Sequence, residues 1–142
     1  MRDQKFIKWG ACVLFIICLG QALYIYFTAP FKPDPVHVVS VTEIAGGGAI
    51  YEILYDSGGA TVPIIYRYFL MAVQPSEDDA LKESMKTAPF LVTQSTEAVR
   101  GVSDGRVKLI TEDRLYEFHN IGYFKVDGEL NVIKFDLTST IP

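Results

Sequence analysis

The apolar and polar residues divide the chain into two parts, of which the first is an uninterrupted apolar segment. Residues 9–27 (WGACVLFIICLGQALYIYF) contain no charged residue, and Gln21 is the only strongly polar side chain among them. At about 1.5 Å of rise per residue, a helix of this length spans the hydrocarbon core of a bilayer. Trp9, Tyr24 and Tyr26 lie near its ends, where amphipathic rings prefer the membrane interface. The segment is therefore predicted to be a transmembrane helix in contact with the lipid bilayer.

The second part has short segments in which apolar and polar residues alternate, separated by glycine, proline and aspartate. This pattern is typical of β-strands joined by turns. The hairpin of residues 49–55 and 60–73, joined by the Asp-Ser-Gly-Gly turn at 56–59, is predicted to form the core of the domain. Strands are predicted over residues 36–45, 49–55, 60–73, 90–94, 100–102, 106–111, 115–119, 123–126 and 130–137.

One short helix is predicted between these strands, from residue 77 to about residue 86. Ser76 is a good N-cap, and three acidic residues follow it in the first turn, where the helix dipole favours negative charge. Leu81 and Met85 are four residues apart and are expected to face the sheet. The predicted fold class is α+β: an N-terminal transmembrane helix followed by a small, mainly antiparallel β domain with one short helix.

Four segments follow from these patterns: an N-terminus at 1–8, the transmembrane helix at 9–27, a proline-rich spacer at 28–35 and an α+β domain at 36–142. Lys5 and Lys8 directly precede the apolar segment, so the positive-inside rule places the N-terminus in the cytoplasm. In a bacterium, the protein would be a single-pass protein of the inner membrane with a periplasmic domain.

A cleavable signal peptide is the alternative interpretation of the apolar segment. Signal peptides have a shorter apolar core and a cleavage site of the small-x-small type. Residues 9–27 are longer than such a core, and the sequence at 24–30 (YIYFTAP) has no clean cleavage site. These features favour an uncleaved anchor.

Charge and composition restrict the classes of partner. The chain of 142 residues has a net charge of −4, and from Val36 onward nine Lys and Arg residues stand against fifteen Asp and Glu residues. Nucleic-acid binding is therefore not predicted, because phosphate neutralisation requires a basic face. An acidic domain suits a basic partner, although mild acidity also simply keeps a domain soluble.

Neither a metal site nor a cofactor is predicted. His37 and His119 are far apart and lie in none of the usual metal-ligand spacings, and Cys12 and Cys18 both lie within the anchor. Ser57 precedes two glycines but lacks the context of a nucleophile elbow.

The protein is not predicted to be an enzyme. Paired carboxylates can support hydrolysis, and Glu112 with Asp113, or Glu43 with Glu52, are the pairs considered. Nothing in the sequence indicates that either pair forms an active site.

Two segments are candidates for contact with a partner protein. Arginine and tyrosine are enriched at protein interfaces, and both occur together at residues 66–68, while an acidic turn is followed closely by an aromatic residue near position 116. The predicted partner-binding residues are Tyr66, Arg67, Tyr68, Glu112, Asp113 and Tyr116.

The sequence YDSGGATV at 55–62, followed by Tyr66-Arg67-Tyr68, resembles a turn with a GGAT core in small single-pass membrane proteins of bacteria. Some of those proteins resemble immunity proteins encoded beside interbacterial toxins. The resemblance implies a periplasmic protein-binding module, in its sharper form an immunity protein that neutralises a toxin by occlusion. The alternative is a structural or accessory subunit of a bacterial envelope complex, in which the anchor itself is a contact surface.

Overall fold

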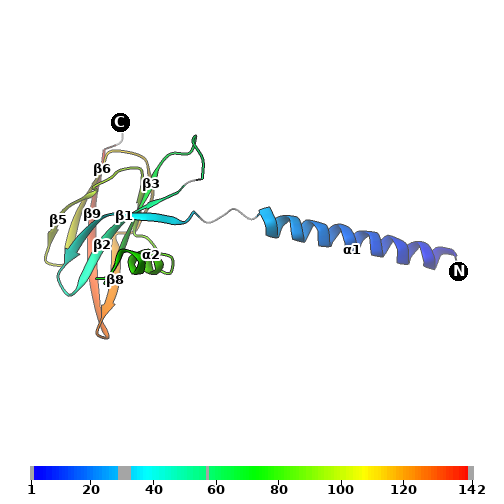
Figure 1. Ribbon diagram of the computed structural model, residues 1–142, viewed down its shortest axis with the longest axis horizontal. Helices are drawn as coiled ribbons and strands as arrows, with labels where there is room; N and C mark the ends of the chain where they lie inside the picture. Colours follow the sequence, from blue (N-terminus) through cyan, green and yellow to red (C-terminus); the bar gives the residue numbers. More distant parts are fainter. Residues whose placement is uncertain (1, 29–32, 57, 141–142) are drawn as a thin grey trace. The chain divides into compact units, whose positions relative to one another are not determined.

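The computed structural model describes residues 2–28, 33–56 and 58–140. Residue 1, residues 29–32 of the predicted spacer, Ser57 in the predicted turn and the last two residues lie outside this description. The chain forms two compact units, residues 1–32 and residues 33–142 (Figure 1).

The first unit consists of one helix, α1 (Arg2–Thr28). It begins before the predicted apolar segment, since residues 2–8 belong to the same continuous helix. Within the described ranges, it is the one helix long and apolar enough to cross a membrane. At about 1.5 Å per residue its length is about 40 Å, which exceeds the hydrocarbon thickness of a bilayer.

The second unit contains two β-sheets, the larger of which we call sheet A. Its strand order is β1-β2-β3-β4-β7, and all four pairings are antiparallel. The β2–β3 pair is the predicted central hairpin, and β3 is the middle strand of this sheet. The strands of sheet A are β1 (Pro35–Ile44), β2 (Gly48–Tyr55), β3 (Ile65–Ala72), β4 (Leu91–Thr93) and β7 (Leu115–Phe118).

The smaller sheet, sheet B, has the strand order β5-β6-β9-β8. The β6–β9 pair is parallel, and the other two pairs are antiparallel, so the predicted mainly antiparallel α+β fold is confirmed. Asp127 and Gly128 both have positive φ (50° and 81°), which is the geometry of a two-residue type I′ turn between β8 and β9. The strands of sheet B are β5 (Val99–Ser103), β6 (Arg106–Thr111), β8 (Ile121–Val126) and β9 (Glu129–Ser139).

The main core lies between the two sheets. Alternate residues of β6 and β9 are buried, including Val107, Leu109, Ile133 and Phe135, and they pack with the inner face of sheet A. The rings of Phe90 and Phe135 are stacked, with centroids 3.9 Å apart. Sheet B therefore buries one face and leaves the other exposed, as period-two alternation predicts.

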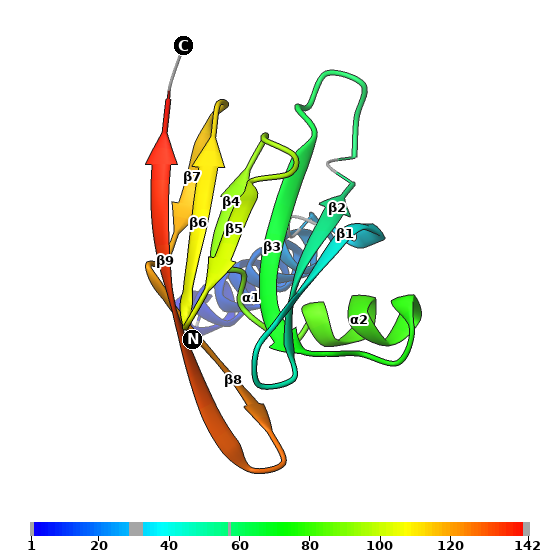
Figure 2. The same cartoon turned by 90° about the vertical axis from the view of Figure 1, so that its left-hand side faces the viewer.

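The helix α2 (Glu77–Ser84) covers the opposite face of sheet A (Figure 2). Ser76 is the N-cap and its hydroxyl accepts a hydrogen bond from the Asp79 N–H, as predicted. The helix ends at Ser84, earlier than expected. Ala80 and Ser84 are its buried residues, whereas Met85 is 62% exposed, so the expectation that Met85 faces the sheet is wrong.

The third strand begins later than predicted, at Ile65 instead of residue 60. The Val62 N–H donates to the Gly59 carbonyl over 3.1 Å, which forms a turn where the strand was expected. Pro63 follows this turn and lacks the N–H that a strand interior requires. The side-chain alternation predicted for this strand holds from Ile65 onward, because Tyr68 and Leu70 face sheet B while Phe69 and Met71 face α2.

Candidate functional site

The predicted Tyr-Arg-Tyr cluster is divided between the two faces of β3. Tyr66 and Tyr68 point into the core between the sheets. Arg67 lies on the α2 face, with its guanidinium carbon 4.4 Å from the centre of the Tyr55 ring. Tyr66 and Arg67 are both half-buried, and they lie on opposite faces of β3, so the three residues do not form one contact surface.

Tyr68 is a core residue and cannot contact a partner in this fold. Its side chain is 0% exposed, and its hydroxyl donates to the Ser95 carbonyl (2.9 Å) and accepts from the Ala98 N–H (3.2 Å). Burial raises the pKa of the Tyr68 phenol far above its ordinary value, and the nearby Glu52 carboxylate raises the pKa further. The prediction that Tyr68 binds a partner is therefore corrected by its burial.

Glu52 is the most unusual polar residue of the core, since it is only 1% exposed. Its carboxylate accepts hydrogen bonds from the Ser40 hydroxyl (2.7 Å) and from the Glu97 N–H (3.2 Å to each oxygen). Glu97 has a positive φ of 51°, which is uncommon for a residue other than glycine. The buried charge thus holds the β4–β5 loop against β2.

The acidic turn predicted as a second contact lies beside this loop. The Ser95 hydroxyl accepts hydrogen bonds from the N–H groups of Glu112 (3.1 Å) and Asp113 (3.0 Å), so the turn is held by its backbone. Both acidic side chains are exposed. Tyr116 is 44% exposed and accepts a hydrogen bond from the Gln94 side chain (2.6 Å). These three residues are exposed, whereas Arg67 is half-buried beside the Tyr55 ring.

The residues considered for chemistry do not form a catalytic or metal-binding constellation within the ranges described. Glu43 pairs with Ala49 and is exposed, while Glu52 pairs with Ser40 and is buried, so the two carboxylates face different environments. No group of three or more His, Cys, Asp or Glu residues that could hold a metal occurs within those ranges. His119 instead forms a surface contact with Glu117 over 2.8 Å.

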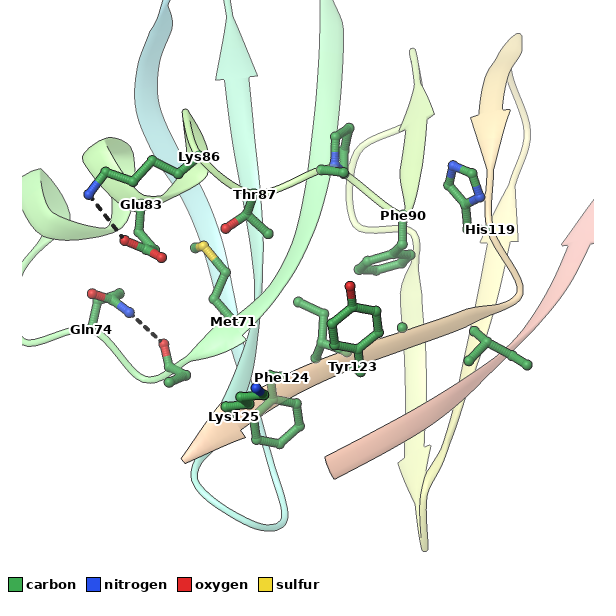
Figure 3. A pocket seen from close by; sticks show the side chains of 16 residues that line it. Met71, Gln74, Glu83, Lys86, Thr87, Phe90, His119, Tyr123, Phe124 and Lys125 are labelled. Atoms are coloured by element: carbon green, nitrogen blue, oxygen red, sulfur yellow. Dashed lines mark hydrogen bonds and ion pairs between the residues drawn. The ribbon is translucent and has the colours of Figure 1, made fainter. Parts of the chain in front are cut away.

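A groove lies between α2, the second half of β3 and β8 (Figure 3). It is open to solvent and has a volume of about 590 Å³. Its floor is apolar, with Met71, Phe90 and Phe124 each nearly inaccessible to solvent. Its rim carries Lys86 from the α2–β4 connection and Lys125 from β8.

The groove exists because β4 is too short to pair with all of β3. β4 pairs only with residues 66–68 of β3. If this register continued, Pro89 would lie opposite Leu70, and proline has no N–H to donate. The second half of β3 is therefore open on the side away from β2.

The alternation of hydrogen bonds shows which backbone groups face the groove. The Val73 N–H donates to Gly47 beside β2, while the Tyr68 carbonyl accepts from Phe90 on the β4 side. In an antiparallel strand, the N–H and C=O groups of successive residues point to opposite edges of the strand. The N–H and C=O groups of Leu70 and Ala72 therefore point towards the groove, where the Gln74 side chain donates to the Ala72 carbonyl (2.9 Å).

The same argument applies to β8, which is an edge strand of sheet B. The Asn120 carbonyl accepts a hydrogen bond from the Phe135 N–H (2.8 Å). The N–H and C=O groups of the even-numbered residues of β8 therefore point towards β9. The N–H and C=O groups of Ile121, Tyr123 and Lys125 consequently point away from β9. The groove is thus bordered by free edges from both sheets.

Gly122 allows these two edges to approach each other. A Cβ at this position would lie 2.9 Å from Leu70 Cδ2 and 2.9 Å from Phe135 Cε2, closer than such atoms pack. Only glycine therefore lets β8 cross β3 at this distance.

A set of exposed apolar side chains continues from the groove onto the outer face of sheet B. Tyr123 (70% exposed) pairs in register with Val132 (52%), and Lys125 pairs with Leu130 (57%). Ile121 (52% exposed) lies next to Tyr123 on the same face of β8. Large apolar groups exposed side by side in this way are typical of interaction sites.

The sequence carries only part of the signal for this surface. The side chains of β8 and β9 alternate between the core and solvent. In residues 121–126 and 130–133, however, large apolar residues occupy both the core-facing and the solvent-facing positions, so the solvent-facing side of the hairpin is not polar. The groove itself has no signal in the sequence, because it depends on the meeting of edges from two sheets.

No known protein family, curated protein sequence or solved structure matches this chain.

Proposed function

We propose that this protein is a membrane-anchored protein-binding module whose β domain lies in the bacterial periplasm. The observation that carries the proposal is the row of large, exposed apolar side chains on the β8–β9 hairpin, flanked by lysines. Apolar and aromatic groups within a polar rim are the usual composition of a protein interface. The buried polar side chains of Glu52 and Tyr68, by contrast, hold loops of the fold through hydrogen bonds.

The proposed location rests on α1 and on the charges before its apolar part. Lys5 and Lys8 precede the apolar segment, which favours a cytoplasmic N-terminus and a periplasmic domain in the inner membrane. Alkaline phosphatase fused after Pro142 tests this topology, because the enzyme is active only outside the cytoplasm. An inactive but well-expressed fusion would contradict the periplasmic location.

In its sharper form, the proposal is an immunity protein that blocks a toxin by covering the toxin's working surface. Anchoring in the membrane would concentrate the inhibitor where a membrane-crossing or membrane-acting toxin arrives. The motif at 55–62 that resembles this class lies in the β2–β3 connection, on a different segment from the β8–β9 hairpin.

Site-directed photo-crosslinking of the full-length protein in its own cells tests protein binding. A photoreactive residue at Val132, in the middle of the apolar set, is expected to give an adduct with one partner in near-stoichiometric yield. The control position is Glu43, which is exposed on β1 of sheet A. Equal adduct patterns at both positions, or none at Val132, would overturn the proposed function.

A hollow on α1 favours the second candidate function, an accessory subunit of an envelope complex. Gly20 has no side chain and leaves a hollow bordered by Ile17, Gln21, Tyr24 and Ile25 on one face of the helix. Small residues and a glutamine on one face can mediate helix association in membranes. Replacing α1 by an unrelated spanning helix should abolish an accessory role, whereas an immunity protein should retain its function.

A further inference from the structure

We propose that the groove between β3 and β8 binds an extended, acidic and apolar peptide segment of the partner protein, which adds a strand to the free edge of β8. The inference rests on the proposed function, since it specifies how the partner is held. Main-chain hydrogen bonds to an exposed strand edge are a common way of recognising peptides.

The backbone supplies the first part of the argument. Ile121, Tyr123 and Lys125 direct their N–H and C=O groups away from β9, and Leu70 directs its own towards the same groove. An added strand beside β8 would therefore find a backbone N–H donor and a C=O acceptor at every second residue of β8. The two free edges lie on opposite sides of one hollow, so the site accommodates a main chain in extended conformation.

The side chains determine what kind of peptide fits. The buried floor of Met71, Phe90 and Phe124 accepts an apolar or aromatic side chain from the peptide. Lys125 is exposed on the rim. Among the described residues, the Lys86 ammonium forms an ion pair with Glu83 at 3.8 Å, and the Lys86 side chain is 75% exposed. A weak, exposed pair of this kind leaves the Lys86 ammonium available for a carboxylate.

The charge of the neighbouring face favours an acidic partner over a second copy of this chain. Arg106, Lys108, Lys125 and Lys134 are all exposed on the outer face of sheet B, and Asp136 is the acidic residue paired with one of them. Two copies joined through β8 would bring these basic faces side by side. An acidic peptide would instead neutralise the face, in a domain that is otherwise acidic.

Fluorescence anisotropy with the full-length protein in detergent micelles tests the inference. The probe is a labelled synthetic peptide that alternates glutamate with valine and phenylalanine. We expect saturable binding, weakened about tenfold or more when alternate peptide nitrogens are methylated, because the methyl groups remove the strand hydrogen bonds. A counterpart with lysine in place of glutamate should also bind about tenfold more weakly.

Two variants at one position separate the main chain from the side chain. Tyr123→Pro removes the outward N–H of β8 but no hydrogen bond to β9, and proline is tolerated at such edge positions. We expect it to abolish peptide binding, while Tyr123→Ala, which keeps the N–H, should retain most of it. Equal binding by both variants, or binding that methylation does not affect, would overturn strand addition.

Hydrogen exchange of the unmodified protein provides a measurement that does not depend on the folding of a variant. The peptide should slow exchange at the amides of Ile121, Tyr123 and Lys125, and unchanged exchange would contradict the inference. Sedimentation that shows a dimer, converted to a monomer by Tyr123→Pro, would assign the β8 edge to a second copy and also overturn it. A partner adduct at Val132 without peptide binding would leave the proposed function intact and remove only this inference.

Discussion

The two halves of β3 have opposite surroundings, although they belong to one strand. Residues 66–68 pair with β2 on one side and β4 on the other. Residues 69–72 pair with β2 alone, and their other edge borders the groove. The first half adjoins a network in which Glu52, Tyr68 and Ser95 are hydrogen-bonded. In the second half, the backbone groups on the side away from β2 have no neighbouring strand.

Stability and recognition therefore depend on different parts of the domain. Buried polar groups are costly unless they are fully hydrogen-bonded, so the network fixes the loops around it. Free strand edges are available for a further strand, so natural proteins usually protect them. Substitutions in the closed half should therefore reduce the free energy of unfolding, and substitutions of exposed side chains at the groove should change binding with little loss of stability.

The largest effect is expected for Glu52→Ala. Removal of the carboxylate leaves the Ser40 hydroxyl and the Glu97 N–H without their acceptor and creates a cavity. We expect a loss of about 3 kcal/mol in the free energy of unfolding. Denaturation of the full-length protein in micelles, followed by circular dichroism, measures it. Glu43→Ala, at an exposed position of β1, is the control and should change stability by less than about 0.5 kcal/mol.

The crossing of β8 over β3 is tested by Gly122→Ala. The added methyl group would overlap Leu70 and Phe135, and overpacking of this kind costs about 1–3 kcal/mol. Gly101→Ala is the matched control, because Gly101 is also in a strand of sheet B and an added Cβ would contact nothing within 4 Å. Equal stability of the two variants would contradict the close approach of the two edges.

Tyr68→Phe should have a smaller effect, of about 1–2 kcal/mol. The ring is retained, but the Ser95 carbonyl and the Ala98 N–H lose their hydrogen-bond partner. The loss is measured by the same denaturation assay. Tyr66→Phe serves as the control, since Tyr66 is only half-buried, and a similar loss in both variants would contradict the role of the network.

The raised pKa of Tyr68 also predicts a dependence of stability on pH. Below the ordinary tyrosine pKa of 10.0 the phenol is neutral in both the folded and the unfolded state. Above it the unfolded state loses the proton while the folded state keeps it, so stability falls as pH rises, by at most about 1.4 kcal/mol per pH unit. Stability curves from pH 8 to 11 test this. Tyr68→Phe should remove that part of the fall, and an identical slope in the variant would contradict it.

The smallest effect on stability is expected at the groove, for Tyr123→Ala. The side chain is 70% exposed, so its removal should change the free energy of unfolding by less than about 0.5 kcal/mol. The same variant should reduce the photo-crosslinked adduct at Val132 less than Tyr123→Pro does, because it keeps the outward N–H of β8. A large loss of stability would mean that Tyr123 supports the fold, and it would contradict the expectation that exposed side chains at the groove contribute little to stability.

Local patterns predicted much of the secondary structure. The apolar segment at 9–27 lies within α1, and the alternating segments from residue 36 onward correspond to the observed strands, because both signals depend on neighbouring residues. Boundaries differed where one residue acted against the pattern, as Pro63 did at the start of β3. Met85 was misplaced because α2 ends one residue before it.

The candidate site was only partly within reach of sequence reasoning. Residues 66–68 suggested an interface by composition, but the alternation of the strand sends Tyr68 into the core and Arg67 to the α2 face. The groove residues have no distinctive local signal, since Lys86 and Tyr123 are unremarkable in their local sequence and His119 lies in no metal-ligand spacing.

The apolar anchor, the acidic balance of the domain and the α+β class follow from the sequence alone, because each is a property of composition or of short-range periodicity. Tertiary structure alone decided the parallel β6–β9 pairing, the burial of Glu52 and the groove between β3 and β8. These three features join residues that are far apart along the chain. Their hydrogen bonds and packing exist only once the two sheets have come together.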